Sequence, residues 1–156
     1  MSSSFFFTSA HHCPRWQELP SLGLYMDQVL QVLGEATAPL RPAGEPACTA
    51  TMINNYVKLK VLAPSEKKKY SQAHMATLML ITMLKTILSM QEIRQILLQV
   101  QSQMPLSEAY DQFCQTLETL LHTVGEPMEK PKSADLLTIC AYAYVSKLGI
   151  QLLLAE

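Results

Sequence analysis

The sequence predicts an all-α protein, and three observations support this. Apolar residues recur at three- and four-residue spacing through most of the chain, which is the period of amphipathic helices. Candidate N-cap residues, Thr49, Ser71 and Ser89, precede such segments, and prolines and glycines separate them. Of the 156 residues 49% are hydrophobic, so the chain can fill a compact core.

The first part of the chain is expected to form an arm and one helix. Residues 1–21 end in a proline-bracketed segment without periodicity, which predicts a surface arm anchored by Trp16. The apolar pattern from Leu22 to about Leu33 predicts an amphipathic helix that Gly34 can end. The segment 38–47 contains three prolines and is expected to be a loop.

A short helix and a polar connector are expected next. The hydroxyl of Thr49 can accept a free backbone N–H, so it is expected to cap a helix that runs to about Leu59. The segment 63–70 starts with Ala63-Pro64 and contains the triplet Lys67-Lys68-Lys69, a composition too polar for the core.

Two further helices follow from capping signals. Ser71 is expected to cap a long helix to about Leu88, whose methionine stripe fits core filling better than a binding groove. The sequence Ser89-Met90-Gln91-Glu92 fits a capping box, which predicts another helix to about Gln103. The methionines of the stripe are Met75, Met79 and Met83.

The C-terminal third is expected to form a pair of helices. Pro105 breaks the chain, and residues 106–124 show helical spacing of apolar side chains. Ser133 is expected to open a last helix that is apolar on nearly every side. Such a helix must be buried, either in its own core or against a second subunit.

Charge is distributed unevenly. Residues 51–94 carry seven basic side chains against two acidic ones, a net charge of +5. The remainder carries five against eleven, or −6, so the overall charge of −1 conceals a basic middle. A basic segment between acidic ends is typical of a module that binds a polyanion, and a solvated lysine face is the alternative.

Other classes of protein have little support in the sequence. The four cysteines show no Cys-x-x-Cys spacing, which favours reduced thiols and a cytoplasmic location. The adjacent His11, His12 and Cys13 lack the spacing of a metal site, so neither a metal nor a cofactor is expected. No signal peptide, membrane-spanning segment, phosphate loop or hydrolase motif is recognisable, so the chain is not expected to be an enzyme or a membrane protein.

The polar face of the helix after Thr49 suggests contact with DNA bases. Asparagine can bond an adenine edge with two hydrogen bonds, and recognition helices present short polar and basic side chains to the groove. Capping or simple solvation of these side chains is the alternative. The face consists of Thr51, Asn54, Asn55 and Lys58.

The order of elements resembles the DNA-binding domain of the MerR family. That family has a recognition helix ending in a Tyr and an apolar pair, then a proline, a basic wing closing on Tyr-Ser, a helix, and a Ser-x-x-Glu-Ile step. The segments 49–62, 64–71 and 88–93 match these parts in order. With the segment 22–29, the chain also looks like a bacterial family of domains of unknown function, noted as MerR-like transcriptional regulators.

The resemblance implies roles for individual residues. Asn54, Asn55 and Tyr56 fall where the MerR family has a DNA-contacting Arg-Tyr-Tyr triplet, Lys68 falls at a phosphate-binding wing arginine, and Tyr70 closes the wing. The chain departs from the family in a longer loop before Thr49, in Lys60 where a glycine is usual, and in a wing without Asn-Gly. The implied DNA-binding residues are Thr51, Asn54, Asn55, Tyr56, Lys58, Lys67, Lys68, Lys69 and Tyr70.

The resemblance therefore implies a fold and a function. The fold is all-α with at most a minimal β wing: an arm at 1–21, a MerR-like winged helix-turn-helix at 22–103, and a C-terminal helical pair at 104–156 that completes the core or forms a dimer. The function is that of a sequence-specific regulator of transcription that binds double-stranded DNA as a homodimer in the cytoplasm. A protein-interaction or structural module without DNA binding is the alternative. Neither the effector nor the operator can be read from the sequence.

Overall fold

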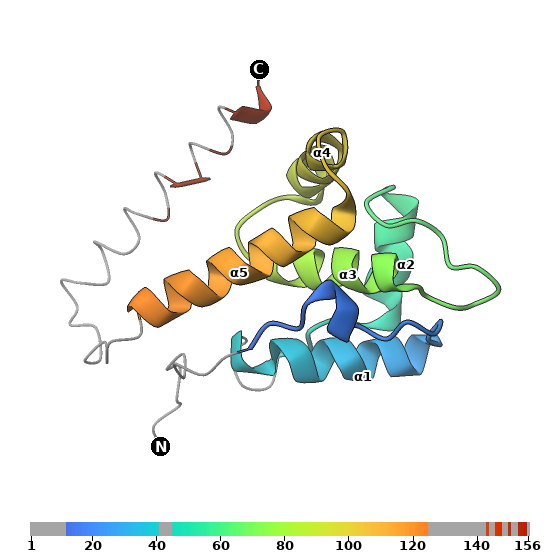
Figure 1. The fold of residues 1–156 in the computed structure, drawn as a ribbon. Coiled ribbons are helices and arrows are strands. Elements are labelled where there is room, and N and C mark those ends of the chain that lie inside the picture. Colours follow the sequence, from blue (N-terminus) through green and yellow to red (C-terminus); the bar gives the residue numbers. More distant parts are fainter. Residues whose placement is uncertain are drawn as a thin grey trace.

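The computed structural model describes residues 12–40 and 45–124, with residues 143, 146, 147, 150 and 153–155. Within these ranges the chain forms five α-helices and two short 3-10 helices, and no extended strand is assigned, so the all-α prediction is confirmed (Figure 1). The elements are η1 (Trp16–Glu18), α1 (Met26–Thr37), η2 (Ala38–Leu40), α2 (Ala50–Lys58), α3 (Gln72–Leu84), α4 (Met90–Gln101) and α5 (Leu106–Val124).

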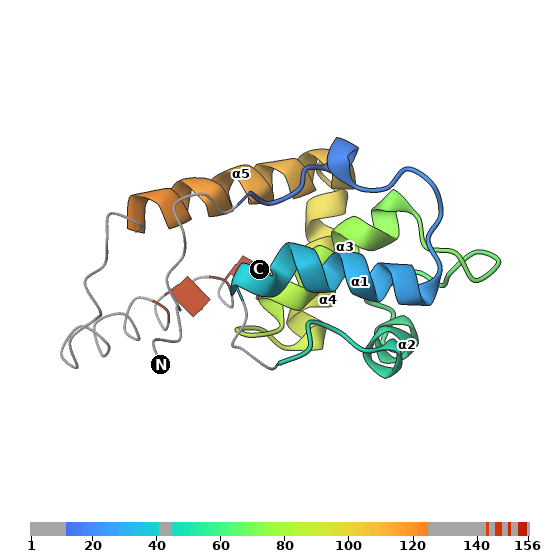
Figure 2. The ribbon, with the colours of Figure 1, turned by 90° about the horizontal axis from the view of Figure 1, so that it is seen from below.

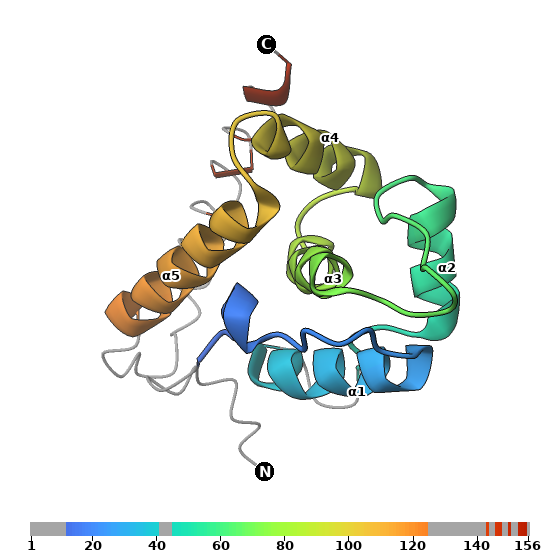
Figure 3. The same cartoon turned by 45° about the vertical axis from the view of Figure 1, so that its right-hand side comes forward.

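Helix α3 forms the centre of the molecule. Nine consecutive residues, His74 to Thr82, are buried. Nine residues cover more than two helical turns, so neighbours must enclose α3 on every side. Figure 3 shows α3 nearly end-on, with α1, α2, α4 and α5 arranged around it. Met75 and Met79 are almost completely buried in this core, and Met83 packs against it, as predicted for the methionine stripe.

The capping residues predicted from the sequence are confirmed. Thr49, Ser71 and Ser89 each precede a helix, and each side chain accepts a hydrogen bond from the backbone N–H three residues later. The capping box at Ser89 is complete, because the carboxylate of Glu92 accepts the Ser89 N–H at 3.0 Å. Local side-chain chemistry therefore fixes where α2, α3 and α4 begin.

The first helix differs from the prediction at both ends. It starts at Met26 rather than Leu22, and it continues through Gly34 to Thr37. Val29, Leu33 and Thr37 are buried at four-residue spacing, and this packing outweighs the roughly 1 kcal/mol by which glycine disfavours a helix. Burial of the helix face, rather than the glycine, decides where α1 ends.

The long helix after Ser71 is shorter than predicted. It ends at Leu84 rather than near Leu88. Leu88 is buried outside the helix, directly before the Ser89 cap, and Ile93 is buried four residues after that cap. Apolar residues at these two positions form the hydrophobic staple that fixes how the chain enters a helix. The chain must therefore leave the helical conformation before Leu88.

The described part of the N-terminal arm, residues 12–21, is part of the core and does not simply lie on the surface. Cys13 and Leu19 are buried, and the Tyr110 hydroxyl of α5 donates to the Pro14 carbonyl at 2.6 Å. The side-chain amide of Gln72, at the start of α3, donates to the Trp16 and Leu19 carbonyls. These partners lie far away in the sequence, which is why the arm showed no periodicity. Figure 2 shows η1 lying against α5.

An ion pair joins the arm to α5. The two guanidinium nitrogens of Arg15 donate to the two carboxylate oxygens of Glu118, each at 2.9 Å. These bonds from Arg15, with the Cys13 backbone N–H, lower the pKa of Glu118 from its ordinary 4.5 to about 2. The Glu118 carboxyl thus takes up its proton near pH 4.5 in the unfolded chain and only near pH 2 in the folded chain. Its contribution to the free energy of unfolding is therefore complete above pH 4.5 and is lost as the pH falls toward 2.

Glu118→Gln is expected to remove this acid sensitivity. The side chain of Glu118 is 25% exposed, so the contribution lost between pH 4.5 and pH 2 is about 1 kcal/mol after allowance for screening. Urea unfolding at a series of pH values would measure it, with the exposed Glu108→Gln on the same helix as the control. An equally steep loss of stability in wild type and Glu118→Gln would contradict the assignment.

The C-terminal region bears on two further expectations. No helix in the described part of the chain is long and apolar enough to cross a membrane. The helix expected from Ser133 falls mostly outside the described residues. Of its described residues, Ile150 packs against the core and Leu153 is 63% exposed.

Candidate nucleic-acid interface

Helix α2 divides cleanly into a buried face and a polar face. Ile53 is fully buried and Tyr56 is 4% exposed, so this side of α2 joins the core. The exposed side chains recur at the three- and four-residue spacing that places them on one stripe of a helix. That stripe, the polar face of α2, consists of Thr51, Asn54, Asn55 and Lys58.

The end of α2 places a lysine where glycine is normal. The N–H of Val61 bonds to the carbonyl of Tyr56 at 3.0 Å, and the N–H of Lys60 bonds to that of Val57 at 3.0 Å. This pair of bonds is the Schellman motif, whose C′ residue adopts the left-handed conformation. Lys60 has φ 59° and is exposed, so its side chain leaves the helix end toward solvent.

Lys60→Gly is expected to raise the free energy of unfolding by about 1 kcal/mol. An L residue in the left-handed region is destabilised by about that amount, and glycine, which has no Cβ, is not. Chemical denaturation would measure the change. Lys60→Ala is the matched control, since it removes the charge but keeps a Cβ at positive φ, and it should give no such gain. Equal stability of Lys60→Gly and Lys60→Ala would contradict the assigned strain.

Two residues of the lysine triplet, Lys67 and Lys68, form the tip of a β-hairpin. Glu66 and Lys69 exchange both backbone hydrogen bonds, at 3.0 and 2.9 Å. The two residues between them have positive φ, 50° for Lys67 and 63° for Lys68, which is the type I′ turn that usually contains Asn-Gly. The absence of Asn-Gly from the sequence therefore did not prevent a hairpin, and its β-structure is limited to isolated bridges.

The hairpin is anchored to the start of α1. Leu24 and Tyr70 exchange backbone hydrogen bonds at 2.9 and 2.8 Å. The Lys69 ammonium lies 5.5 Å from the centre of the Tyr25 ring, a cation–π distance. Gly23 permits the close approach, because a Cβ there would lie 3.0 Å from that of Lys69. This anchor fixes the direction in which the tip lysines project.

His74 holds the connector between α2 and the hairpin. Its Nδ1 accepts the Ser71 backbone N–H at 3.0 Å, so the ring proton is on Nε2. That Nε2–H lies 3.1 Å from the Ala63 carbonyl and 3.0 Å from the Pro64 carbonyl. The ring also packs edge-on against Tyr70, with centroids 5.4 Å apart. One buried imidazole thus ties the connector and the hairpin to the start of α3.

The residues predicted to bind DNA separate into two groups. The polar face of α2 and the three lysines of the triplet are exposed. Tyr56 and Tyr70 are buried, at 4% and 6% exposure, so they support the surface and do not lie on it. Burial raises the pKa of Tyr56 to about 12, in agreement with a core position.

Sequence reasoning missed two residues of this region. Lys60 was counted among the basic residues and noted as a replacement for a glycine, but it was not included among the DNA-binding residues, and it adds a third positively charged side chain at positive φ. His74 was not predicted to have a structural role, although its position three residues after Ser71 is the one where a capping box has Glu or Gln.

Helix α2 and the connector lie on the same side of the molecule. Figures 1 and 2 both draw them together at the right. Glu66 is the only acidic residue from position 51 to position 91, so basic and amide side chains dominate this region. The connection from α1 to α2 spans residues 38–49, longer than the 3–4 residues typical of a helix-turn-helix. Among the described residues no group of three or more His, Cys, Asp or Glu could hold a metal ion.

These features define an all-helical protein that presents a polar helix face and a basic hairpin with a two-residue turn. The chain belongs to a family defined by a domain of unknown function, DUF1836, whose family model matches residues 14–113. Membership in a domain-of-unknown-function family is thereby confirmed. The matched range begins in the arm and ends in α5, so it includes the whole candidate interface. Neither a curated protein nor a solved structure matches the chain significantly.

Proposed function

We propose that this protein is a sequence-specific regulator of transcription, of MerR-like type, that binds double-stranded DNA as a homodimer. The polar face of α2 would contact base edges, and the lysines at the helix end and the hairpin tip would contact phosphates. The observation that carries the proposal is the conformation of Lys60, Lys67 and Lys68, which are all exposed and all have positive φ.

Lysine at these three positions costs stability. The left-handed conformation costs an L residue roughly 1 kcal/mol or more, and glycine or asparagine would avoid most of that cost. Residues held in unfavourable backbone regions are concentrated at functional sites. These exposed turns keep positively charged side chains although the conformation destabilises the fold. That observation supports contact with a polyanion.

The chemistry of the interface fits DNA. Asn54 and Asn55 carry amides that can donate to and accept from an adenine edge, and Lys58 adds a cation on the same helix face. Lysine binds phosphate as a point charge and needs no fixed geometry. Tyr56 and Tyr70 enter the proposal as buried supports, and Lys69, partly engaged with Tyr25, as a flanking charge.

Fluorescence anisotropy on a pool of labelled promoter DNA, at low and at physiological salt, tests the proposal. Tight binding that prefers some sequences and weakens with salt is expected, because phosphate contacts release counterions. No binding at either salt concentration would overturn the regulator assignment.

Two single substitutions separate the proposed roles. Lys68→Ala is expected to weaken binding to every sequence about fivefold and to reduce the salt slope by about one, as for one lost phosphate contact. Asn54→Ala should weaken binding to the preferred site by roughly tenfold and leave nonspecific binding nearly unchanged. Unchanged binding in both variants would exclude this face from the interface.

The alternative, a protein-interaction module, is favoured by one observation. A groove of about 500 Å³ lies between the end of α2 and α4, lined in part by Val57, Val61 and Leu97. Leu98 at its edge is 58% exposed. Light scattering of wild type and Leu98→Glu would test it: self-association that Leu98→Glu abolishes, without DNA binding in wild type, would favour this alternative.

A further inference from the structure

The structure brings two cysteines from opposite ends of the described domain into contact. The sulfur atoms of Cys13, in the arm, and Cys114, in α5, lie 3.0 Å apart, although 101 residues separate them. Both side chains are almost completely buried, at 1% and 0% exposure. Their distant positions in the sequence gave no sign of this pairing.

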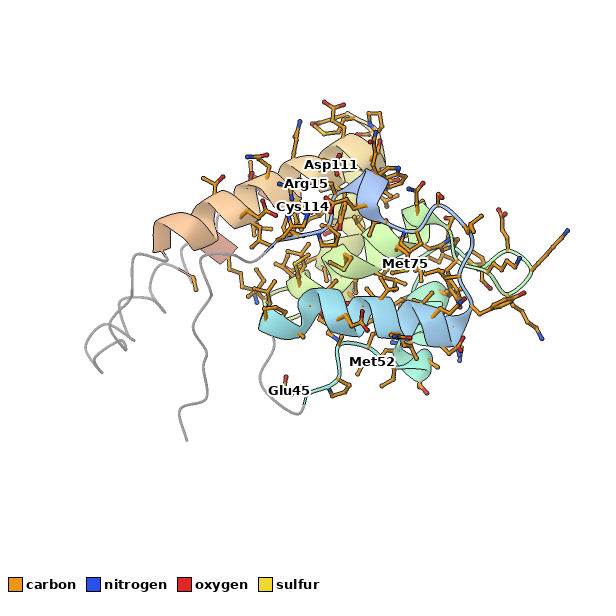
Figure 4. All side chains as sticks on the ribbon, turned by 60° about the horizontal axis from the view of Figure 1, so that its bottom comes forward. Arg15, Glu45, Met52, Met75, Asp111 and Cys114 are labelled. Carbon is orange, nitrogen blue, oxygen red and sulfur yellow. The ribbon has the colours of Figure 1, made fainter. Side chains whose placement is uncertain are left out.

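Several bonds hold the two thiols in this arrangement. The backbone N–H of Cys13 donates to Glu118 at 2.7 Å, and the Tyr110 hydroxyl donates to the next carbonyl, that of Pro14. The Trp16 N–H donates to Asp111 at 2.8 Å. Figure 4 shows Arg15, Asp111 and Cys114 close together where the arm meets α5. These contacts hold the arm against α5 and keep the two sulfur atoms next to each other.

The surroundings favour one thiol as the nucleophile. The hydrogen bond from Cys13 is the largest influence on the pKa of Cys114 and lowers it, and the Arg15 guanidinium lowers it further, against the opposing effects of burial and of Asp111. The same contact raises the pKa of Cys13, as does its burial. Cys114 is therefore the thiol of the pair that ionises more readily, and a neutral Cys13 thiol lies beside it, which is the arrangement of an attacking and a resolving cysteine.

We propose that Cys13 and Cys114 form a reversible intramolecular disulfide with a low-molecular-weight disulfide, such as oxidised glutathione, as the oxidant. The Cys114 thiolate attacks the small disulfide, forms a mixed disulfide and releases one small thiol. The Cys13 sulfur then attacks the Cys114 sulfur and expels the second small thiol. The protein loses two electrons and two protons, and the small disulfide becomes two thiols.

The arm provides the route by which the oxidant reaches the buried pair. Terminal segments open locally at lower cost than the whole domain unfolds. Release of the bonds around Pro14 and Arg15 would expose both sulfurs together. Once formed, the disulfide would fix the arm on α5, and reduction would restore its ability to open.

Cys48 provides the internal comparison. It is buried as well, but its thiol donates to the Thr49 carbonyl at 3.6 Å instead of facing another sulfur. Burial raises its pKa. It should therefore react more slowly than the arm pair. The double variant Cys48→Ser/Cys140→Ser keeps only Cys13 and Cys114 and is the matched control.

Titration with oxidised glutathione, followed by non-reducing peptide mapping of the full chain, tests the proposal. A peptide that joins Cys13 to Cys114 and lacks two hydrogens is expected in wild type and in the control. Closing a loop of this length should raise Tm by on the order of 10 °C, reversibly with dithiothreitol. Cys114→Ser should lose this gain.

Three results would overturn the proposal. Wild type could carry only glutathione adducts, could form a different linkage, or could stay reduced while a surface thiol standard is fully oxidised. Peptide mapping of wild type decides among these results without any variant, so a poorly folding Cys13→Ser or Cys114→Ser would not affect the test. None of them depends on DNA binding.

Discussion

Lys67→Asn/Lys68→Gly is expected to make the protein more stable and to weaken its binding to DNA. The stability gain arises because Asn-Gly is the preferred pair for a type I′ turn, whereas lysine at both positions is strained. The expected increase in the free energy of unfolding is about 1–2 kcal/mol. Urea denaturation would measure it.

The proposed function predicts the loss of binding, because the variant removes two of the lysines proposed to contact phosphates. Affinity for DNA at physiological salt is expected to fall about 10- to 30-fold, and the slope of log K against log salt by about two. Fluorescence anisotropy across a salt series would measure both. The opposite signs of the two effects are informative, because a variant that merely damaged the fold would lose stability and binding together.

Lys67→Ala/Lys68→Ala is the matched control for the Asn-Gly variant. It removes the same charges but keeps two Cβ atoms at positive φ, so it should weaken binding equally without gaining stability. Unchanged salt dependence in both double variants would contradict a role for the hairpin tip in DNA binding. Equal stabilities of the two variants would contradict the assigned turn strain.

Leu78→Ala is expected to lower the free energy of unfolding by about 3–5 kcal/mol. Leu78 is fully buried in the middle of α3, and its truncation leaves a cavity that rigid neighbours on several helices cannot easily fill. The same core cluster includes residues of the arm, α1, α4 and α5. The loss should therefore appear as one cooperative transition of reduced midpoint in urea denaturation.

Leu98→Ala makes the same chemical change on the surface. Leu98 is 58% exposed on α4, so its truncation should alter stability by no more than about 0.5 kcal/mol. If the two Leu→Ala variants were equally stable, the central position of α3 would be contradicted. A second transition in Leu78→Ala would indicate that arm and α5 unfold separately from the central helix.

The helices, and the starting points of α2, α3, α4 and α5, could be predicted from the sequence because their signals are local. A cap such as Thr49 or Ser89 acts through a backbone N–H three residues away, so the necessary information lies within one turn. The bounds of α5, residues 106–124, followed from Pro105 and apolar periodicity alone. The exposed stripe of α2 also followed from helical spacing, because neighbouring residues determine which side can be buried.

Features that depend on distant partners could not be predicted. Gly34 reads as a helix end until the packing of Val29 and Leu33 is known. The arm has no pattern of its own because α5 supplies its hydrogen bonds. Tyr56 and Tyr70 resembled contact residues, and only the core around α3 shows that they are buried.

The sequence by itself determined a helical protein with a basic middle, capped helices and a polar stripe on α2, because composition, charge and spacing are properties of short segments. The tertiary structure decided which conformation the lysines take and which cysteines meet. Positive φ at Lys60 occurs in the turn that ends α2, and positive φ at Lys67 and Lys68 occurs in the turn that joins the paired residues Glu66 and Lys69. Cys13 and Cys114 come together only when the arm packs on α5, since contact over 101 residues is a consequence of the assembled core.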